Sequence, residues 1–444
     1  MSKAKNITLW GTWLLMSLAL AGYLAYGLWG EEQADALYLP DAASHGHYQI
    51  ELACDACHGD GFEDEDAMQA VCIDCHGDEL KLANDSHPVK KFNDPRNAER
   101  LEILNARYCI TCHVEHAPER TRVMGVTLAD DFCVLCHQNV ADERASHQDL
   151  PFDGCSAAGC HNYHDNRALY EDFLVKHADA EETVEAPLLP ERDYQKVYQQ
   201  QGNVAEEALL AADMDGGDNG NDVAIVDGWA SSAHAATGVN CRGCHQSTWQ
   251  AKPAMTVCED CHEGEMAGFV AGRHGMRLPQ TLSEMTPADA RQPMRVDAYS
   301  AGLSCGSCHD VHRADTRYAA VEACQGCHDD EHSHNYTQSV HYQLWQKELE
   351  GSGAPNSGVS CASCHLPRIE MESRGEDLMR VQHNQNANLR PNEKMIREVC
   401  MACHSLRFSI DALADEALVK NNFNGKPSKH VESIDWAIGR VKKE

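Results

Sequence analysis

The sequence predicts a mainly α fold with extensive loops, in which two cysteine- and histidine-rich modules follow one N-terminal transmembrane helix. Three observations lead to this prediction. All 22 cysteines stand in pairs that are followed at once by a histidine. Aromatic residues make up only 6% of the chain, and one uncharged stretch near its start is 25 residues long. Such a chain cannot build an ordinary apolar core, so we expect short helices and almost no sheet.

The first element is an apolar helix. Residues 6–30 carry no charge and are long enough to cross a bilayer. Two lysines precede the stretch and acidic residues follow it, which keeps the N-terminus in the cytoplasm and exports the rest. A cleaved signal peptide is the alternative, with a small-x-small site at residues 19–21. Cleavage there would leave residues 22–30 as an apolar end, so we favour an uncleaved inner-membrane anchor over residues 1–31, with the body in the periplasm.

Eleven copies of one motif follow. In ten of them two residues separate the cysteines and the histidine comes next: Cys54/Cys57/His58, Cys72/Cys75/His76, Cys109/Cys112/His113, Cys133/Cys136/His137, Cys241/Cys244/His245, Cys258/Cys261/His262, Cys305/Cys308/His309, Cys324/Cys327/His328, Cys361/Cys364/His365 and Cys400/Cys403/His404. The eleventh copy, Cys155/Cys160/His161, is fifth in chain order and has four residues between its cysteines.

This motif is the attachment signature of c-type haem. The two thiols add across the haem vinyl groups, and the adjacent histidine ligates the iron. A single copy could instead belong to a zinc ribbon or a redox dithiol. Zinc sites gather their ligands in sets of four, whereas here the histidine follows the second cysteine every time and no cysteine remains for a disulfide. We therefore predict eleven covalently attached haems c.

The spacing of the motifs indicates how the chain folds. Residues 54–404 hold all eleven motifs, which leaves roughly 32 residues per haem. We expect the haems to pack against one another and to serve as the core. Haem binding then supplies folding free energy, so the chain should not fold without haem.

The formal net charge of −32 bears on the partners. It argues against nucleic acid, because phosphate binding needs a basic face. An acidic surface suits docking to basic redox proteins, and such steering would be sensitive to salt. The alternative is that acidity keeps a haem-dense protein in solution.

The motifs fall into two clusters, which predicts two modules. We expect a pentahaem module over residues 32–177 and a hexahaem module over residues 234–444. Between them, residues 178–230 contain 13 acidic and two basic residues, so we predict an acidic linker over residues 178–233. Residues 410–420 are expected to form a short helix near the C-terminus.

The chain has 26 histidines, of which 15 lie outside the motifs. That is enough to give every iron a second, distal histidine, with four to spare. Two histidines close the coordination of an iron and give a lower potential than a histidine–methionine pair. We predict as distal ligands His87, His116, His147, His164, His177, His234, His274, His312, His332, His341 and His383. His45, His47 and His430 are the weakest candidates, together with one of His332 and His334.

Three motif histidines are followed by another histidine three positions later: His113/His116, His161/His164 and His309/His312. If each motif opens a helical turn, both rings of such a pair leave the same face of the helix. They cannot then ligate one iron from opposite sides. We therefore expect the second histidine to reach a neighbouring haem.

Part of the second half resembles the hydroxylamine oxidoreductase and multihaem nitrite reductase superfamily. The matching segments are residues 303–313, 323–345, 358–368 and 399–405. The resemblance covers about residues 234–410 and implies that His332 and His341 are distal ligands to other haems. The chain has no Cys-x-x-Cys-Lys motif and no tyrosine after His404, which are the catalytic devices of those families. The resemblance therefore implies the fold more than the activity.

The five-motif half resembles cytochrome c3-like modules through Cys-His-x-x-His at residues 112–116 and 160–164. An N-terminal anchor that precedes several haems also resembles membrane quinol dehydrogenases of the tetrahaem type.

These observations predict a membrane-anchored cytochrome that relays electrons from quinol or a membrane partner to a periplasmic or outer-membrane acceptor. One alternative is an oxidoreductase that acts on a small nitrogen or sulfur species at an open haem, with Arg273 and His274, or Arg390 and Lys394, binding an anion. Another is a cytochrome subunit of a larger respiratory complex. The sequence leaves the oligomeric state open.

Overall fold

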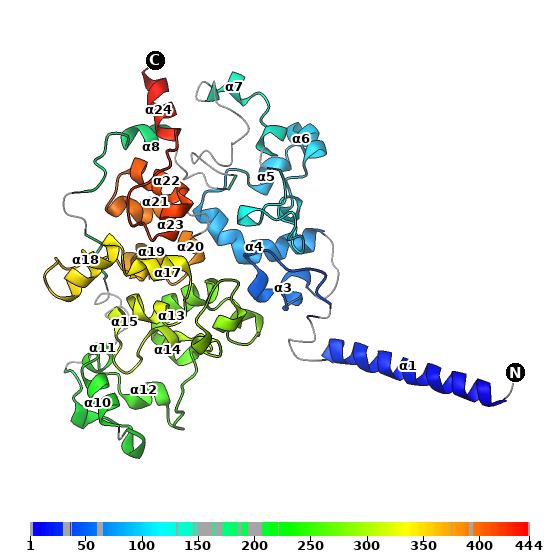
Figure 1. Cartoon of the computed structure of the whole chain (residues 1–444), viewed down its shortest axis with the longest axis horizontal. Coiled ribbons are helices and arrows are strands. Elements are labelled where there is room, and N and C mark those ends of the chain that lie inside the picture. Colours follow the sequence, from blue (N-terminus) through cyan, green and yellow to red (C-terminus); the bar gives the residue numbers. More distant parts are fainter. Residues whose placement is uncertain are drawn as a thin grey trace. The chain divides into compact units, whose positions relative to one another are not determined.

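The computed structural model consists mainly of short helices joined by loops, which confirms the predicted fold class (Figure 1). In the part of the chain that it describes, the strands are β1 (Arg368–Ser373) and β2 (Glu376–Val381), which pair antiparallel as a hairpin. The described residues are 3–29, 36, 38–59, 65–129, 132–144, 147–148, 163–164, 171–184, 188–193, 207–220, 222–373, 375–389 and 394–442.

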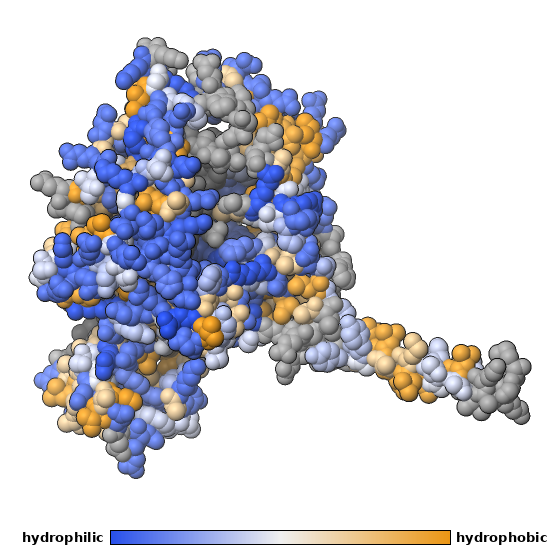
Figure 2. Space-filling view, viewed as in Figure 1, coloured by the Kyte–Doolittle hydropathy of each residue, from blue (hydrophilic) through white to orange (hydrophobic). Residues whose placement is uncertain are grey.

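The N-terminal stretch forms one helix, α1 (Lys3–Trp29). Its segment Thr8–Tyr26 is long and apolar enough to cross a membrane, with a mean hydropathy of 1.3, and none of it is buried. Figure 2 shows hydrophobic residues along this helix. A membrane anchor and a signal sequence both have this form, so the chain has one N-terminal apolar helix of either kind.

The chain divides into two compact units. Unit 1 comprises Met1–Ala157, Asn162–Arg167 and Pro279–Leu282; unit 2 comprises Ala158–His161, Ala168–Leu278 and Ser283–Glu444. Besides α1, the helices of unit 1 are η1 (Tyr48–Ile50), α3 (Asp55–His58), α4 (Glu65–Leu82), α5 (Val89–Phe92), η2 (Pro95–Asn97), α6 (Ala98–Ile103), η3 (Cys109–Thr111), η4 (Val123–Gly125), η5 (Phe132–Leu135) and α7 (Val140–Glu143).

Unit 2 contains more helices. They are α8 (Glu171–Lys176), η7 (Ala211–Asp213), η8 (Gly217–Gly220), α10 (Val223–Ala230), α11 (Ala233–Ala236), α12 (Cys241–His245), α13 (Thr256–Ala271), η10 (Pro287–Asp289), η11 (Val296–Ala298), α14 (Cys305–Cys308), α15 (Thr316–Ala320), α16 (Glu322–Gln325), α17 (Glu331–Tyr336), α18 (Val340–Leu349), α19 (Cys361–His365), α20 (Asn386–Leu389), α21 (Lys394–Glu398), η12 (Cys400–Ala402), α22 (Leu406–Ala414), α23 (Glu416–Lys420) and α24 (Ser433–Val441). The turn η9 (Leu278–Gln280) crosses the boundary between the units.

Unit 1 has almost no buried apolar side chain of its own. Among its described residues only Ala43 and Ala117 are buried hydrophobic residues. Polar contacts instead hold α4: the side-chain oxygen of Gln69 accepts the backbone N–H of Cys109 at 2.8 Å, and the Tyr108 hydroxyl donates to Asp66 at 3.0 Å. Two buried alanines cannot stabilise a domain, which agrees with a core made of prosthetic groups.

Unit 2 differs because it contains small apolar cores. One joins α8, α21, α22 and α24, and its buried members are Leu174, Ile396, Leu406, Ile410, Ile434 and Ala437. A second brings together Val321, Tyr336 and Trp345. Burial of large aliphatic side chains of this kind stabilises by about 1.5–3 kcal/mol each. The C-terminal helices of unit 2 therefore pack by ordinary side-chain contacts.

The described parts of the acidic segment lie along unit 2. The backbone N–H of Leu189 donates to the carbonyl of Asn356 at 2.7 Å, and that of Asp193 donates to Met379 on β2 at 2.9 Å. The Asp193 carboxylate in turn accepts the N–H of Met379 at 2.9 Å. These parts are therefore bonded to the body of the unit, and a linker with the boundaries 178–233 stays a prediction.

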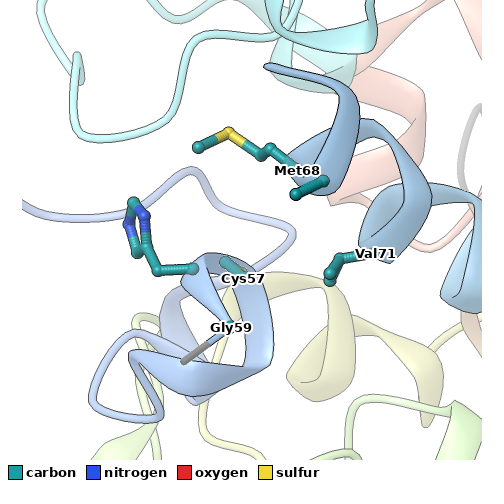
Figure 3. Close-up of a pocket in the computed structure, with 6 residues that line it drawn as sticks. Cys57, Gly59, Met68 and Val71 are labelled. Carbon is teal, nitrogen blue, oxygen red and sulfur yellow. The ribbon is translucent and has the colours of Figure 1, made fainter. Parts of the chain in front are cut away.

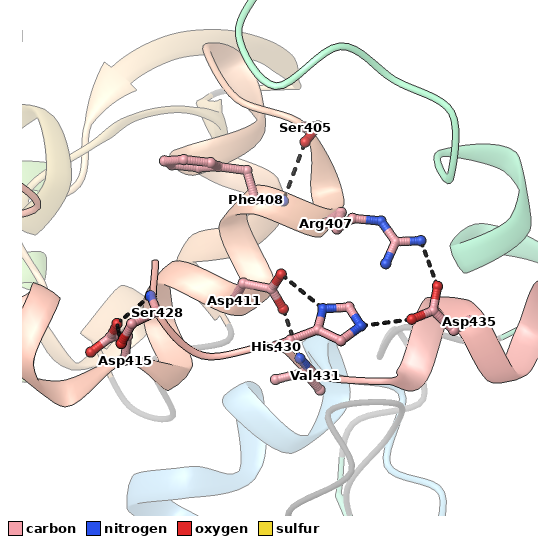
Figure 4. Close-up of polar contacts among 9 residues, drawn as sticks. All are labelled: Ser405, Arg407, Phe408, Asp411, Asp415, Ser428, His430, Val431 and Asp435. Atoms are coloured by element: carbon pink, nitrogen blue, oxygen red, sulfur yellow. Dashed lines mark hydrogen bonds and ion pairs between the residues drawn. The ribbon is translucent and has the colours of Figure 1, made fainter. Parts of the chain in front are cut away.

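The predicted helix over residues 410–420 is wrong in one respect, because two helices meet there. The first, α22, ends at Ala414, and Asp415 caps the start of α23 by accepting the N–H of Leu418 at 3.2 Å. The same carboxylate accepts both the backbone N–H and the hydroxyl of Ser428 at 2.7 Å (Figure 4). Asp favours a helix start over a helix interior for this reason.

Candidate haem-binding sites

Most of the regular motifs fold as single helical turns. The N–H of the motif histidine donates to the carbonyl of the first cysteine at 2.9 Å in the pair His58–Cys54, at 2.9 Å in His309–Cys305 and at 2.8 Å in His404–Cys400. This i→i+4 bond is that of one α-helical turn. It brings both thiols and the imidazole of a motif close together, as attachment of one haem requires.

The second and seventh motifs differ, because each lies inside a longer helix. Cys75 is on α4 and Cys261 is on α13, and both helices begin before the first cysteine of the motif. The expectation that each motif opens a helical turn is therefore wrong for these two, since the preceding residues are already helical.

The thiols of Cys75 and Cys261 nevertheless lie near the motif that comes before each of them. The charge of Cys75 contributes to the raised pKa of Cys57, and that of Cys261 contributes to the raised pKa of Cys244. Cys75 is exposed, and neither thiol is among the residues that line a small pocket beside Cys57 and Met68. Haem attachment at Cys75 and Cys261 therefore stays a prediction from the motif.

A serine or asparagine precedes several motifs and starts the turn. Asn240 caps α12 by accepting the N–H of Cys241 at 2.8 Å. Ser360 caps α19 by accepting the N–H of Ser363 at 3.2 Å, and the Ser363 hydroxyl accepts the N–H of Ser360 at 3.0 Å. Such reciprocal bonds satisfy backbone donors that the helix leaves unpaired. They hold the first cysteine at a fixed place in the turn.

No disulfide joins any of the twenty described cysteines. Instead, first cysteines of consecutive motifs meet. A hydrogen bond between the thiols of Cys72 and Cys109 raises the pKa of Cys72, and a bond with Cys258 likewise raises the pKa of Cys305. Motifs that are adjacent in sequence are therefore adjacent in space.

Second cysteines of consecutive motifs also lie within electrostatic reach of one another. Burial, and then the charges of Cys109, Cys133 and Cys136, raise the pKa of Cys112 to about 11. In four further cases the pKa of a second cysteine is raised by burial and by cysteine charges of the next motif. The motifs concerned are, in chain order, the first and second, the sixth and seventh, the eighth and ninth, and the tenth and eleventh. Each unit thus contains a series of neighbouring motifs.

The main geometric finding is that motif histidines face second histidines. In the described part of the chain, nine such pairs have ring centres between 5.8 and 6.4 Å apart. In unit 1 they are His76–His47, His113–His164 and His137–His87. In unit 2 they are His245–His312, His262–His234, His309–His383, His328–His274, His365–His332 and His404–His341.

This separation fits two ligands on one iron. An imidazole nitrogen lies about 2 Å from a metal that it ligates, and the ring centre lies about 1.1 Å beyond it. Two rings on opposite sides of one iron therefore have centres about 6.2 Å apart. Within the described residues, no group of three or more histidine, cysteine or acidic side chains is arranged to hold a metal ion, as a zinc site would require. The donor set fits haem iron between paired histidines.

Burial keeps these rings neutral, which is the form that ligates a metal. It lowers the pKa of His274, His309, His341 and His365 to about 4. A second histidine nearby lowers each value further, because two positive charges repel.

Backbone carbonyls orient several of the second histidines. Nδ1 of His87 bonds to the carbonyl of Tyr163 at 2.7 Å, and Nδ1 of His383 bonds to that of Val381 at 3.0 Å. An N–H bond at one ring nitrogen fixes the tautomer and leaves the other nitrogen for a metal.

Comparison with known proteins agrees with this geometry. The cytochrome c3 family matches residues 46–138, which hold the first four motifs. The multiheme cytochrome MtrA of Shewanella baltica (strain OS185) is 22% identical over 198 residues. The chain is a multihaem c-type cytochrome.

The match with MtrA covers 39% of this cytochrome and 45% of MtrA, so the chain spans less than half of that relative's length. No solved structure matches this cytochrome. The likeness to the relatives supports covalently bound haem c and a role in electron transfer. The resemblance of residues 234–410 to the hydroxylamine oxidoreductase superfamily is not among these findings and stays a prediction.

Three other predicted ligands are placed by different contacts. Nδ1 of His116 bonds to the carbonyl of Asp41 at 2.7 Å. The ring of His177 packs on Phe173 with centres 4.5 Å apart. His147 is bonded through its backbone N–H to Arg144 at 2.9 Å. The fifth motif, Cys155, Cys160 and His161, lies outside the described residues.

His47 makes a contact that its place in the sequence did not indicate. Its position before the first motif placed it among the weakest candidates, yet its ring faces His76 at 5.8 Å. The number of histidines could have indicated it, because residues 32–164 contain five histidines besides His45 and the motif histidines, one for each motif. The other weak candidates make different contacts: His334 pairs with Asp329 at 3.0 Å, and His430 with Asp435 at 2.6 Å.

The residues proposed for an anion site lie as follows. His274 is partly buried and faces His328. Arg273 donates to the side chain of Asn386 at 3.2 Å. Lys394 is the first residue of α21, and Arg390 lies outside the described residues. In the described chain, His274 therefore faces a motif histidine, and its role as a second ligand stays a prediction.

A hollow adjoins the first motif (Figure 3). Its lining residues are Cys57, His58, Gly59, Ala67, Met68 and Val71. Met68 and Val71 extend from α4 toward it. A haem bound to this motif would therefore lie against an apolar wall, and the Met68 thioether is a second possible ligand beside His116.

Proposed function

We propose that this cytochrome relays electrons through eleven covalently bound haems, each held between two histidines. The haem iron supplies the electron-accepting and electron-donating chemistry, and the protein sets its position and potential. The cysteine pairs attach the haems, the motif histidines ligate from one side and the second histidines from the other. The observation that carries this proposal is the set of nine histidine pairs with the separation expected for one shared iron.

Two of the histidine pairs follow one rule, and this rule assigns a second histidine to the first motif. His164, three residues after the fifth motif histidine, faces His113 of the third motif. His312, three residues after the eighth, faces His245 of the sixth. In both cases the added histidine serves the motif two places earlier. By the same rule His116 serves the iron of His58.

The remaining predicted ligand of unit 1, His147, is then assigned to the fifth motif. The first five motifs would use His47, His87, His116, His147 and His164 for five irons, and the last six motifs would use six histidines for six irons. His45, His177, His334 and His430 would be the four without a haem. Every iron would be closed, which favours electron transfer over conversion of a small substrate.

The contacts between consecutive motifs support a path that follows the sequence. Thiols of the second and third motifs meet at Cys72 and Cys109, and those of the ninth and tenth meet at Cys324 and Cys361. Each thiol is an attachment point at a haem edge, so neighbouring haem edges would lie close together. In each unit we therefore propose that electrons pass between haems in chain order.

We propose further that α1 anchors the protein in the inner membrane, with the haem units in the periplasm. Its 19-residue apolar segment and the exclusively extracytoplasmic assembly of haem c support this location. The donor would be quinol or a quinol-oxidising membrane subunit, and the acceptor a soluble or outer-membrane redox protein. The net charge of −32 suits a basic partner.

Two measurements on the purified full-length protein test the proposal. Intact mass gives the number of attached haems, expected to be eleven. Electron paramagnetic resonance of the oxidised protein counts high-spin and low-spin irons, and all should be low-spin. Several haems fewer, zinc in their place, or more than one high-spin iron would contradict the proposed relay.

A further inference from the structure

Glu115 occupies an unusual place between two predicted ligands, His113 and His116. Its carboxylate accepts a hydrogen bond from Nδ1 of His47 at 2.7 Å and another from the backbone N–H of Ser44 at 2.6 Å. Two donors on one carboxylate stabilise its ionised form. Glu115 therefore places a negative charge against His47, the proposed second ligand of the second motif.

The direct bond of Glu115 is with His47, whose ring faces His76 of the second motif. Any effect of Glu115 on the basicity of a haem ligand should therefore be largest at the second motif.

Several other second histidines bond to neutral groups, although Nδ1 of His164 lies 3.3 Å from the Asp85 carboxylate. Nδ1 of His87 faces the carbonyl of Tyr163, and Nδ1 of His383 faces that of Val381. At the second motif, the opposite ring also has an acidic neighbour, because Nδ1 of His76 lies 3.3 Å from Glu79. Among the nine pairs in the described chain, this is the one with a carboxylate oxygen within 3.3 Å of Nδ1 on both rings.

We propose that Glu115 is a positioning residue that gives the haem between His47 and His76 the lowest reduction potential in unit 1. A carboxylate that accepts the Nδ1–H bond makes the imidazole a more basic ligand and fixes its orientation. A more basic ligand stabilises oxidised iron, which lowers the potential. The inference rests on the proposed assignment of His47 and His76 to one iron.

The test uses the full-length, haem-loaded protein and the substitution Glu115→Gln. Glutamine keeps the size of the side chain and can still accept the Ser44 N–H, but it removes the negative charge. We expect the lowest-potential component of unit 1 to move to higher potential in an optical redox titration. One low-spin haem should also change its g-values, while the haem content stays constant.

Glu119→Gln is the matched control. Glu119 lies four residues later, is 66% exposed and pairs with Arg120 at 3.4 Å. This substitution removes the same charge without touching a ligand, so the lowest component should stay in place. Glu115→Asp is the second variant in case Glu115→Gln loses haem: it keeps the charge but lengthens the bond to His47, and should give a smaller shift in the same direction.

His47→Ala identifies the component that responds. Loss of this ligand should turn a single haem high-spin, and that haem must be the one that shifts in Glu115→Gln. A high-spin haem in His47→Ala with no shift in either Glu115 variant would overturn the role of Glu115 alone. No new high-spin haem in His47→Ala would overturn the ligand assignment, and the role of Glu115 with it.

Discussion

The ring centres of His164 and His113 lie 6.4 Å apart, although His164 follows the fifth motif and His113 belongs to the third. Nδ1 of His164 lies 3.3 Å from Asp85, a contact that orients its ring. By the proposed assignment, a short sequence element would supply a ligand to one haem and a second ligand to another. Because each haem would be bound by two distant parts of the chain, haem attachment and folding are coupled.

The first prediction concerns His164. Substitution His164→Ala should turn a single haem from low-spin to high-spin, because the iron of His113 loses its second ligand. Electron paramagnetic resonance of the oxidised protein measures this. His177→Ala is the control, because His177 packs on Phe173 and should leave the spin states unchanged. A high-spin haem in His177→Ala with none in His164→Ala would contradict the assignment.

The second prediction concerns the first motif. If His116 serves the iron of His58, His116→Ala should also produce a single high-spin haem. Met68→Leu should have no such effect, although Met68 lines the hollow beside His58. The same spectroscopy decides between them. A high-spin haem in Met68→Leu, with a low-spin spectrum in His116→Ala, would assign the thioether instead and contradict the two-motif rule.

The helical turn of most motifs could be predicted from the sequence, but the second histidine that faces each motif could not. Most motifs form one turn because the bond runs from His58 to Cys54, or from His404 to Cys400, within four residues. The choice of second ligand depends on how loops fold back, as in the pairing of His87 with His137. No local sequence pattern marks the second histidine of a motif, which is why His47 was placed among the weakest candidates.

Fold class was predictable for a related reason. Few aromatic residues and many motifs exclude a large apolar core, and in the described part of unit 1 the buried hydrophobic residues are alanines. The break between α22 and α23 was missed because Asp415 reads as part of a continuous helical pattern. Asp415 caps α23 through the nearby N–H of Leu418, and its further bond with the N–H of Ser428 forms only in the folded chain.

The third prediction concerns the apolar core of unit 2. Leu406 is fully buried at the start of α22, against Leu174 and Ile410. Substitution Leu406→Ala should lower the free energy of unfolding by about 2–5 kcal/mol, because it leaves a cavity. Leu82, which is 70% exposed, is the control, and Leu82→Ala should change stability by no more than about 0.5 kcal/mol. Denaturant unfolding of the haem-loaded protein gives both values, and equal effects would contradict a packed core.

The fourth prediction is a pH dependence at His430 (Figure 4). Its ring bonds to Asp435 at 2.6 Å and to Asp411 at 3.2 Å, and these bonds raise its pKa above 6.5. A raised pKa means that the folded state favours the protonated ring. This stabilisation is fully present below the pKa of the unfolded chain and is lost as pH rises through the higher, folded value.

His430→Gln should therefore destabilise the protein at pH 5.5 more than at pH 8.5. Thermal unfolding at the two pH values measures the difference, and titration of the His430 ring by nuclear magnetic resonance gives its pKa directly. An equal loss of stability at both pH values would show that His430 stabilises the fold by packing and not by its charge.

The fifth prediction separates the two readings of α1. If α1 is an anchor, the protein from the membrane fraction should have an intact mass that includes residues 1–31, and deletion of Thr8–Tyr26 should abolish export, because the helix also directs the chain to the membrane. Replacement of the helix by a cleavable signal peptide should then release a haem-loaded protein into the soluble periplasmic fraction. If the intact mass of the native protein instead corresponds to a chain that begins after residue 21, the N-terminal stretch is a signal peptide. The protein would then have to reach its membrane donor by docking alone.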